Sequence, residues 1–144
     1  MLLCGTNTYE VVMDKIIFEK LPDMKNIDGV KRWTEERGEF VQIAYKEEIR
    51  HLAFFELKKK FFRGSHFHMQ KEEIFYVISG KIRAIFRDIK TLQQEERILV
   101  KGDKLRVKTG CGHIFYGLED STVVEYSPQY FDKNDTYPID FGIK

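Results

Sequence analysis

Residues 63–80 read RGSHFHMQKEEIFYVISG, and among them His66, His68 and Glu73 are of the kinds that bind metal ions. His66 and His68 are separated by one residue. On a β-strand, such residues project from the same face about 7 Å apart at Cα, so two imidazoles can converge on one ion. Glu73 follows a short connection, and an apolar run then leads to Gly80. The stretch predicts two strands that carry ligand-type residues on a shared face.

A fourth residue of this kind, His113, lies much later in the chain, after two glycines that flank a cysteine. An antiparallel barrel can bring such distant strands to one point. Imidazole and carboxylate ligands suit Zn, Fe, Ni or Mn, and a mixed set leaves coordination positions open for a substrate. An HxH pair alone is more often two surface or cross-strand histidines. The metal-free alternative is a pocket whose histidines hydrogen-bond to one another and to Glu73.

The rest of the chain is typical of an all-β protein. Short segments rich in Val, Ile, Phe and Tyr alternate with charged or glycine-containing turns, which favours a sandwich or barrel. The predicted strands are 11–21, 38–45, 50–58, 66–69, 73–79, 81–88, 94–100, 103–108, 112–118 and 121–127. One helix is predicted, at 28–36. The aromatic residues of the tail, 128–144, predict that it packs against the body.

Composition narrows the class of protein. The chain has 144 residues, of which 42% are hydrophobic, and this suits one domain with a sizeable core. A net charge of +1 gives no reason to expect a nucleic-acid or membrane partner. Two cysteines make a poor disulfide framework, and the sequence contains neither a signal-peptide pattern nor a long apolar run. We therefore expect a cytoplasmic protein.

Two motifs resemble those of the cupin superfamily. The first, HxH followed by glutamate and then glycine, is matched from His66 to Gly80, although its leading glycine is displaced. The second is matched at Gly102, Gly110 and His113, while Lys108 replaces its proline and Gly117 its asparagine. Glu73 fits the spacing on both sides, whereas Glu72 does not.

This resemblance implies a jelly-roll barrel, also called a double-stranded β-helix. We expect one domain over 1–144, with the barrel core at about 38–127 and the tail at 128–144. The resemblance also implies that His66, His68, Glu73 and His113 bind a divalent transition metal.

The RGSH entry to the first motif resembles the cupins that act on sugar nucleotides: deoxythymidine-diphosphate-sugar 3,5-epimerases, 3,4-ketoisomerases and cupin domains of capsular-polysaccharide synthesis proteins. By that resemblance Arg63 binds phosphate and His66 is the base. The acid would be a tyrosine or the metal, and among the candidates Tyr76, Tyr116, Tyr126 and Tyr130 we assign this role to Tyr126. The tail also resembles that of the polysaccharide-synthesis cupins. Against these readings, a basic turn such as the one ending at Arg63 is usually a solvated face.

Three functions are compatible with this site. The first is epimerisation or isomerisation of a nucleotide-linked sugar in polysaccharide biosynthesis. The epimerases lack the second histidine of HxH, which this chain keeps, and this favours metal-assisted isomerisation or sugar binding over a metal-free epimerase. An iron-dependent oxygenase of the small-cupin type, in which Fe uses the same ligands with open positions, is an alternative. A sugar-binding or regulatory cupin without catalytic activity is another. We expect a carbohydrate or nucleotide-sugar ligand, and a homodimer that covers open sheet edges.

Overall fold

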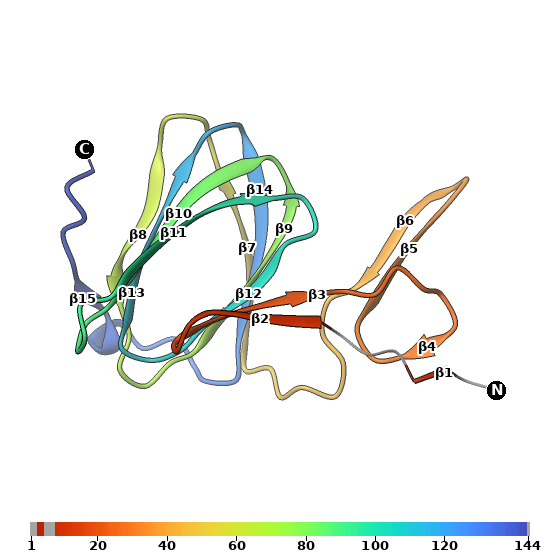
Figure 1. Ribbon diagram of the computed structural model, residues 1–144, viewed down its shortest axis with the longest axis horizontal. Coiled ribbons are helices and arrows are strands. Elements are labelled where there is room, and N and C mark those ends of the chain that lie inside the picture. Colours follow the sequence, from red (N-terminus) through yellow and green to blue (C-terminus); the bar gives the residue numbers. More distant parts are fainter. Residues whose placement is uncertain (1–2, 5–7, 144) are drawn as a thin grey trace.

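Two antiparallel sheets face each other in the computed structural model, which describes residues 3–4 and 8–143 (Figure 1). The five-stranded sheet has the order β11-β10-β13-β8-β15, and the six-stranded sheet has the order β2-β3-β12-β9-β14-β7. The strands of these sheets are β2 (Thr8–Met13), β3 (Ile16–Lys20), β7 (His51–Leu57), β8 (Phe62–Phe67), β9 (Glu73–Ser79), β10 (Lys81–Asp88), β11 (Gln94–Val100), β12 (Lys104–Val107), β13 (Cys111–Gly117), β14 (Ser121–Ser127) and β15 (Tyr137–Pro138).

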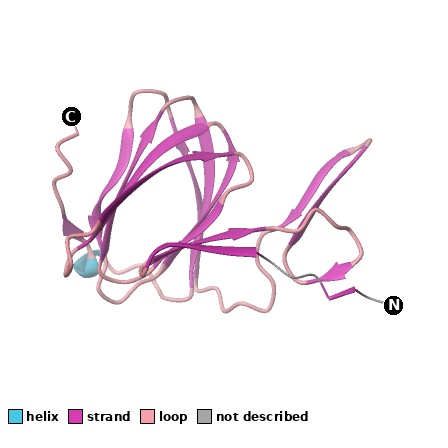
Figure 2. Ribbon diagram, viewed as in Figure 1, coloured by secondary structure: helices cyan, strands magenta, loops and turns pink. Residues whose placement is uncertain are grey.

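The all-β prediction is confirmed, since the described residues contain one 3-10 turn, η1 (Lys133–Asp135), as their single helical element (Figure 2). None of their helical segments is long and apolar enough to cross a membrane.

Three sequence predictions were wrong in detail. The strand predicted at 66–69 begins earlier, as β8 over Phe62–Phe67, and ends before His68. The predicted helix at 28–36 is instead β5 (Lys31–Glu35), which pairs with β6 (Gly38–Gln42) in a hairpin that extends away from the barrel. Trp33 and Phe40 stack across this hairpin with ring centroids 4.4 Å apart, and such cross-strand aromatic pairs favour strands. The single strand predicted at 11–21 is divided into β2 and β3 by a turn.

Apolar side chains fill much of the space between the two large sheets. The core draws on both sheets, because alternate residues of every strand point inward. Its fully buried members include Ile16, Ile82, Ala84, Phe86 and Leu105. This core fixes the strand register from which the polar residues described below project.

The remaining segments lie outside the barrel. β4 (Ile27–Asp28) forms a short parallel pair with β1 (Leu3–Cys4). A second apolar cluster, in which Leu21 and Val30 pack against Tyr76 of β9, attaches the N-terminal region to the outer face of the six-stranded sheet. At the other end of the chain, β15 adds to the edge of β8. The tail thus packs on the body, as its aromatic residues predict.

Candidate metal centre

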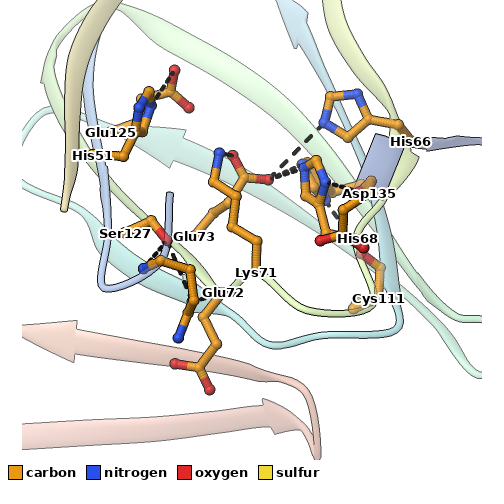
Figure 3. A network of polar contacts seen from close by, with 12 residues as sticks. His51, His66, His68, Lys71, Glu72, Glu73, Cys111, Glu125, Ser127 and Asp135 are labelled. Atoms are coloured by element: carbon orange, nitrogen blue, oxygen red, sulfur yellow. Dashed lines mark hydrogen bonds and ion pairs between the residues drawn. The ribbon is translucent and has the colours of Figure 1, made fainter. Parts of the chain in front are cut away.

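Four ligand-type side chains meet inside the barrel, at the end where β8 stops. His66 and His68 come from β8 and the residue after it, Glu73 begins β9, and His113 lies on β13. One ligand atom from each residue lies within 4.8 Å of the ligand atoms of the other three. Figure 3 shows His66 and His68 directed toward Glu73. The four residues predicted from the motifs are therefore brought together.

The Oε1 atom of Glu73 lies at the centre of this group. It is 2.9 Å from Nε2 of His68, 3.2 Å from Nε2 of His113 and 4.0 Å from Nε2 of His66. The atom is buried, yet none of these contacts has the geometry of a hydrogen bond. Buried carboxylate oxygens nearly always accept a hydrogen bond. A buried oxygen that accepts none and is surrounded by imidazole nitrogens fits, together with those nitrogens, the donor set of a transition-metal ion.

Burial and mutual charge set the protonation of the cluster. Burial raises the pKa of Glu73, but the His113 and His68 imidazoles outweigh burial and hold the net pKa well below its usual range. Burial lowers the pKa of His68, and its contact with Glu73 more than reverses this, so the net pKa is raised. His66 differs, because burial and then the His113 charge lower its pKa to about 4. At neutral pH, His66 thus keeps a free lone pair for a metal or a proton.

A β-bulge at Gly64 and Ser65 sets the direction of the first histidine. Residues three apart on a regular strand face opposite sides, yet Arg63 pairs with Phe115 and His66 with His113, two positions on the same inner face. Gly64 has φ +91° and Ser65 φ +65°. A Cβ atom on Gly64 would meet the His113 carbonyl oxygen at 2.8 Å, so glycine is required both for its dihedral angle and for the close approach.

Arg63 lies at the rim of the same inner face. Its guanidinium is centred 5.4 Å from the Phe55 ring, and its Nε donates to the backbone oxygen of Glu56 at 2.8 Å. The side chain is exposed, and its terminal amino groups have no protein hydrogen bond among the described residues. A guanidinium held in this way can still present a planar fork to an anion.

Tyr126 is not brought to the cluster. It pairs with Ile74 across β14 and β9, so its side chain lies on the outer face of the sheet, opposite to Glu73. There its hydroxyl donates to Glu47 at 2.8 Å. Burial and then this hydrogen bond raise the pKa of Tyr126, which makes the phenol a poorer acid. The position of Tyr126 gives no support to its predicted role as the acid at His66.

Three polar residues that the motifs did not identify share the inner space with the cluster (Figure 3). Lys71 is buried, with its Nζ 3.7 Å from Oε2 of Glu73. Glu125 has a pKa raised by burial and by the charge of Glu73, and its Oε1 is 3.8 Å from Nε2 of His51. The period-2 pattern of β14 and β7 places Glu125 and His51 inward, which is the one sequence signal that could have identified them.

Comparison with known proteins supports the same fold and family. Residues 33–137 match the family described as "Polysaccharide biosynthesis C-terminal domain". The UDP-2-acetamido-2,6-beta-L-arabino-hexul-4-ose reductase of Pseudomonas aeruginosa is 30% identical over 129 residues. That match covers 85% of this chain and 34% of the relative, so the chain spans about a third of the relative's length.

Several solved sugar-nucleotide enzymes share the barrel. The dTDP-4-dehydrorhamnose 3,5-epimerase of Sulfolobus tokodaii superposes with a TM-score of 0.80 and 19% identity, covering 96% of this chain and 84% of that one. The dTDP-6-deoxy-D-glucose-3,5-epimerase of Legionella pneumophila, in complex with dTDP-4-keto-L-rhamnose, superposes with a TM-score of 0.77 and 16% identity, covering 95% of this chain and 79% of that one. A 3,4-ketoisomerase from Helicobacter canadensis superposes with a TM-score of 0.66 and 15% identity, covering 75% of this chain and 85% of that one.

At identities this low, the superpositions show a common fold and nothing beyond it. This fold is the predicted cupin barrel. The match over residues 33–137 goes further than fold. The chain belongs to the family of polysaccharide biosynthesis C-terminal domains, and its barrel is a cupin of the type found in the sugar-nucleotide epimerases.

Proposed function

We propose that this domain is a metal-binding cupin that epimerises or isomerises a nucleotide-linked keto sugar. The observation that carries the proposal is the convergence of three imidazole nitrogens and a carboxylate oxygen within 4.8 Å inside a barrel of this family. The relative from Pseudomonas aeruginosa is named for a UDP-linked ketosugar, and the solved epimerases are named for dTDP-linked ones. Their ligands suggest the substrate class.

The distances divide the four residues into two groups. His68 and His113 are buried and lie close to Glu73, whereas His66 is half-buried and 4.0 Å from it. A single Nε2 lone pair cannot bind a metal and accept a proton at once. His68, Glu73 and His113 would therefore hold a metal ion throughout. His66 would complete the set in the absence of substrate and would act as the base in its presence.

The chemistry follows from these positions. A divalent ion held by these residues would supply Lewis-acid stabilisation to the oxygen of a keto group. His66, neutral because of its lowered pKa, would accept the proton from the carbon next to that keto group. The buried Lys71 ammonium adds positive charge to the site, which favours a developing oxyanion. Arg63 at the rim would hold a phosphate of the nucleotide.

Substrate binding and proton exchange test the proposal together. Incubation in D₂O with a panel of UDP- and dTDP-linked 4-keto sugars should introduce deuterium next to the carbonyl, detected by NMR. Arg63→Ala should weaken binding by roughly 1.5–3 kcal/mol, and Arg63→Lys should not restore it, because an ammonium lacks the planar fork. Free monosaccharides should bind far more weakly, since they lack the diphosphate.

If no nucleotide sugar binds below millimolar concentration and no exchange occurs, the proposal fails. Iron content coupled to oxygen consumption would then favour the oxygenase, and sugar binding without exchange would favour a non-catalytic cupin.

We also propose that residues 1–144 form one domain that assembles as a homodimer. Both outer strands of the six-stranded sheet expose apolar side chains: Tyr9 and Val11 on β2, and Leu52 and Phe54 on β7, the last two 68% and 69% exposed. Open edges of this kind need covering. Light scattering at micromolar concentration should give twice the 17.1 kDa chain mass, and a monomer mass would contradict the assignment.

A further inference from the structure

The second ring nitrogen of His68 is held by the tail of the chain. Nδ1 of His68 lies 2.6 Å from the backbone oxygen of Asp135, and both residues are buried. A carbonyl oxygen can only accept, so Nδ1 carries a proton and donates it. Nε2 is then the nitrogen directed at Glu73, 2.9 Å away (Figure 3). This hydrogen bond fixes both the ring orientation and the atom that is free to bind a metal.

The side chain of Asp135 ties the same residue to the backbone that follows His68. One carboxylate oxygen accepts from the backbone N–H of Met69 at 2.9 Å, and the other accepts from that of Gln70 at 3.1 Å. Asp135 also ends η1, where its own N–H donates to the backbone oxygen of Asp132 at 3.0 Å. Asp135 therefore holds the His68 imidazole through its backbone oxygen, and it holds the backbone of Met69 and Gln70 through its side chain.

Residues around Asp135, here called the C-terminal strap (132–139), continue this contact along β8. Tyr137 pairs with Phe67 and Pro138 with His66, and the rings of Tyr137 and Phe67 stack at 5.2 Å. The hydroxyl of Ser65 donates to the backbone oxygen of Ile139, and the backbone N–H of Ile139 donates to the backbone oxygen of Ser65 at 3.0 Å. The strap thus covers the edge of β8, which carries His66, and also contacts His68 just beyond the end of that strand.

The other two histidines lack such a partner. Nδ1 of His113 lies 3.3 Å from the Cys111 oxygen, two residues away on its own strand. His66 has no hydrogen bond among the described residues other than those of its backbone. Of the three, only the imidazole of His68 depends on a distant part of the chain.

We propose that Asp135 is a positioning residue for the metal centre, which sets the tautomer and the orientation of His68 from the C-terminal strap. The proposal rests on the metal-binding function argued above. It assigns the tail a role in the chemistry of the site, beyond closing the barrel.

Two measurements on the full-length chain test it. In the metal-free protein, NMR should detect a slowly exchanging His68 Nδ1 proton, since burial and the Asp135 carbonyl protect it. Asp135→Ala keeps the backbone carbonyl that accepts from His68 but removes the side-chain bonds to Met69 and Gln70 that hold this carbonyl in place. Zn²⁺ titration should therefore show a weaker affinity, by up to the roughly 10–100-fold that loss of a ligand's hydrogen-bond partner costs, and the His68 signal should broaden. Asp135→Asn keeps an oxygen that can accept from Met69, so it should retain most of both properties.

Asp140→Ala is the matched control. Asp140 is another tail aspartate that accepts a backbone N–H, from Gly142 at 2.7 Å, and among the described residues no hydrogen bond or ion pair joins its side chain to β8. This variant should bind Zn²⁺ like the wild type.

The outcomes separate this proposal from the proposed metal site. Wild-type Zn²⁺ affinity with an intact His68 signal in Asp135→Ala would overturn the positioning role. If that variant does not fold, the wild-type spectrum decides, because a His68 ring without a protected Nδ1 proton also overturns it. If the wild type binds no Zn²⁺ but shows the protected proton, the proposed metal site is wrong, while the hydrogen bond between His68 and Asp135 is confirmed.

Discussion

The inner face of the barrel changes character along its strands. On β9, Glu73 lies at one end, and Phe75 and Val77 continue the same face into hydrocarbon. On β13, His113 is likewise followed by Phe115. The polar and apolar halves are therefore built from the same strands. The apolar half fixes the register, and the polar half uses that register to converge its ligands. Stability and site chemistry should then respond to different substitutions.

The largest effect on stability is expected in the apolar half. Ile82 is fully buried and pairs with Leu99 and Gly117, away from the cluster. Ile82→Ala should lower the free energy of unfolding by roughly 2–5 kcal/mol, because it leaves a cavity in a packed core. Denaturant unfolding measures this loss, and metal titration of the folded variant should give wild-type stoichiometry. Loss of metal binding at full stability would break the division between the halves.

A smaller effect is expected where the halves meet, at the bulge. Gly64→Ala places a Cβ against the His113 carbonyl and strains a left-handed residue, which should cost roughly 1–3 kcal/mol and weaken metal binding as well. Gly142→Ala is the control, because φ is +75° there but nothing lies within 4 Å of the added atom. It should cost about 1 kcal/mol and leave metal affinity unchanged. Equal effects of the two substitutions on metal affinity would argue against the bulge as a positioning device.

The pH dependence of the metal-free protein should show the smallest of these effects. The folded-state pKa of His66 is lowered from 6.5 to about 4, chiefly by burial. As pH falls from 6.5 toward 4, His66 is protonated in the unfolded chain but stays neutral in the folded chain. Protonation therefore stabilises the unfolded chain, and the free energy of unfolding decreases over this range. His68, with its raised pKa, acts in the opposite sense: it stabilises below 6.5, and that contribution is lost as pH rises through its folded-state pKa.

Comparison with His66→Gln isolates the His66 contribution. Wild type should lose more unfolding free energy than His66→Gln over this acid range, measured by denaturant unfolding at several pH values. Parallel profiles would contradict the pKa assignment.

Local patterns predicted most of the fold, because strand alternation and turn residues are local properties. The strands at 73–79, 81–88, 94–100 and 121–127 have the bounds predicted. The motif spacing also identified Glu73 over Glu72, which instead pairs with Arg106. The prediction of a helix at 28–36 was wrong. The charged residues of this segment are compatible with a helix when considered locally, but its pairing with β6 makes it a strand.

The parts of the site that escaped prediction depend on tertiary contacts. Spacing cannot show that Lys71 is buried beside Glu73, because this requires the barrel to close around it. Nor can it show that Asp135 reaches His68, 67 residues away in the chain. The sequence contains several tyrosines and does not show that the side chain of Tyr126 lies on the outer face of its sheet. The pairing of β14 with β9 shows that it points to the outer face.

The metal content of the purified protein tests the central claim most directly. Elemental analysis after mild purification, or Zn²⁺ titration of the metal-free chain, should give about one divalent transition metal per chain, as four converging ligand-type residues imply. The double variant His66→Ala, His68→Ala should keep its fold, judged by circular dichroism, and bind none. Full metal content in the double variant, or a folded wild type that binds no divalent metal, would contradict the account.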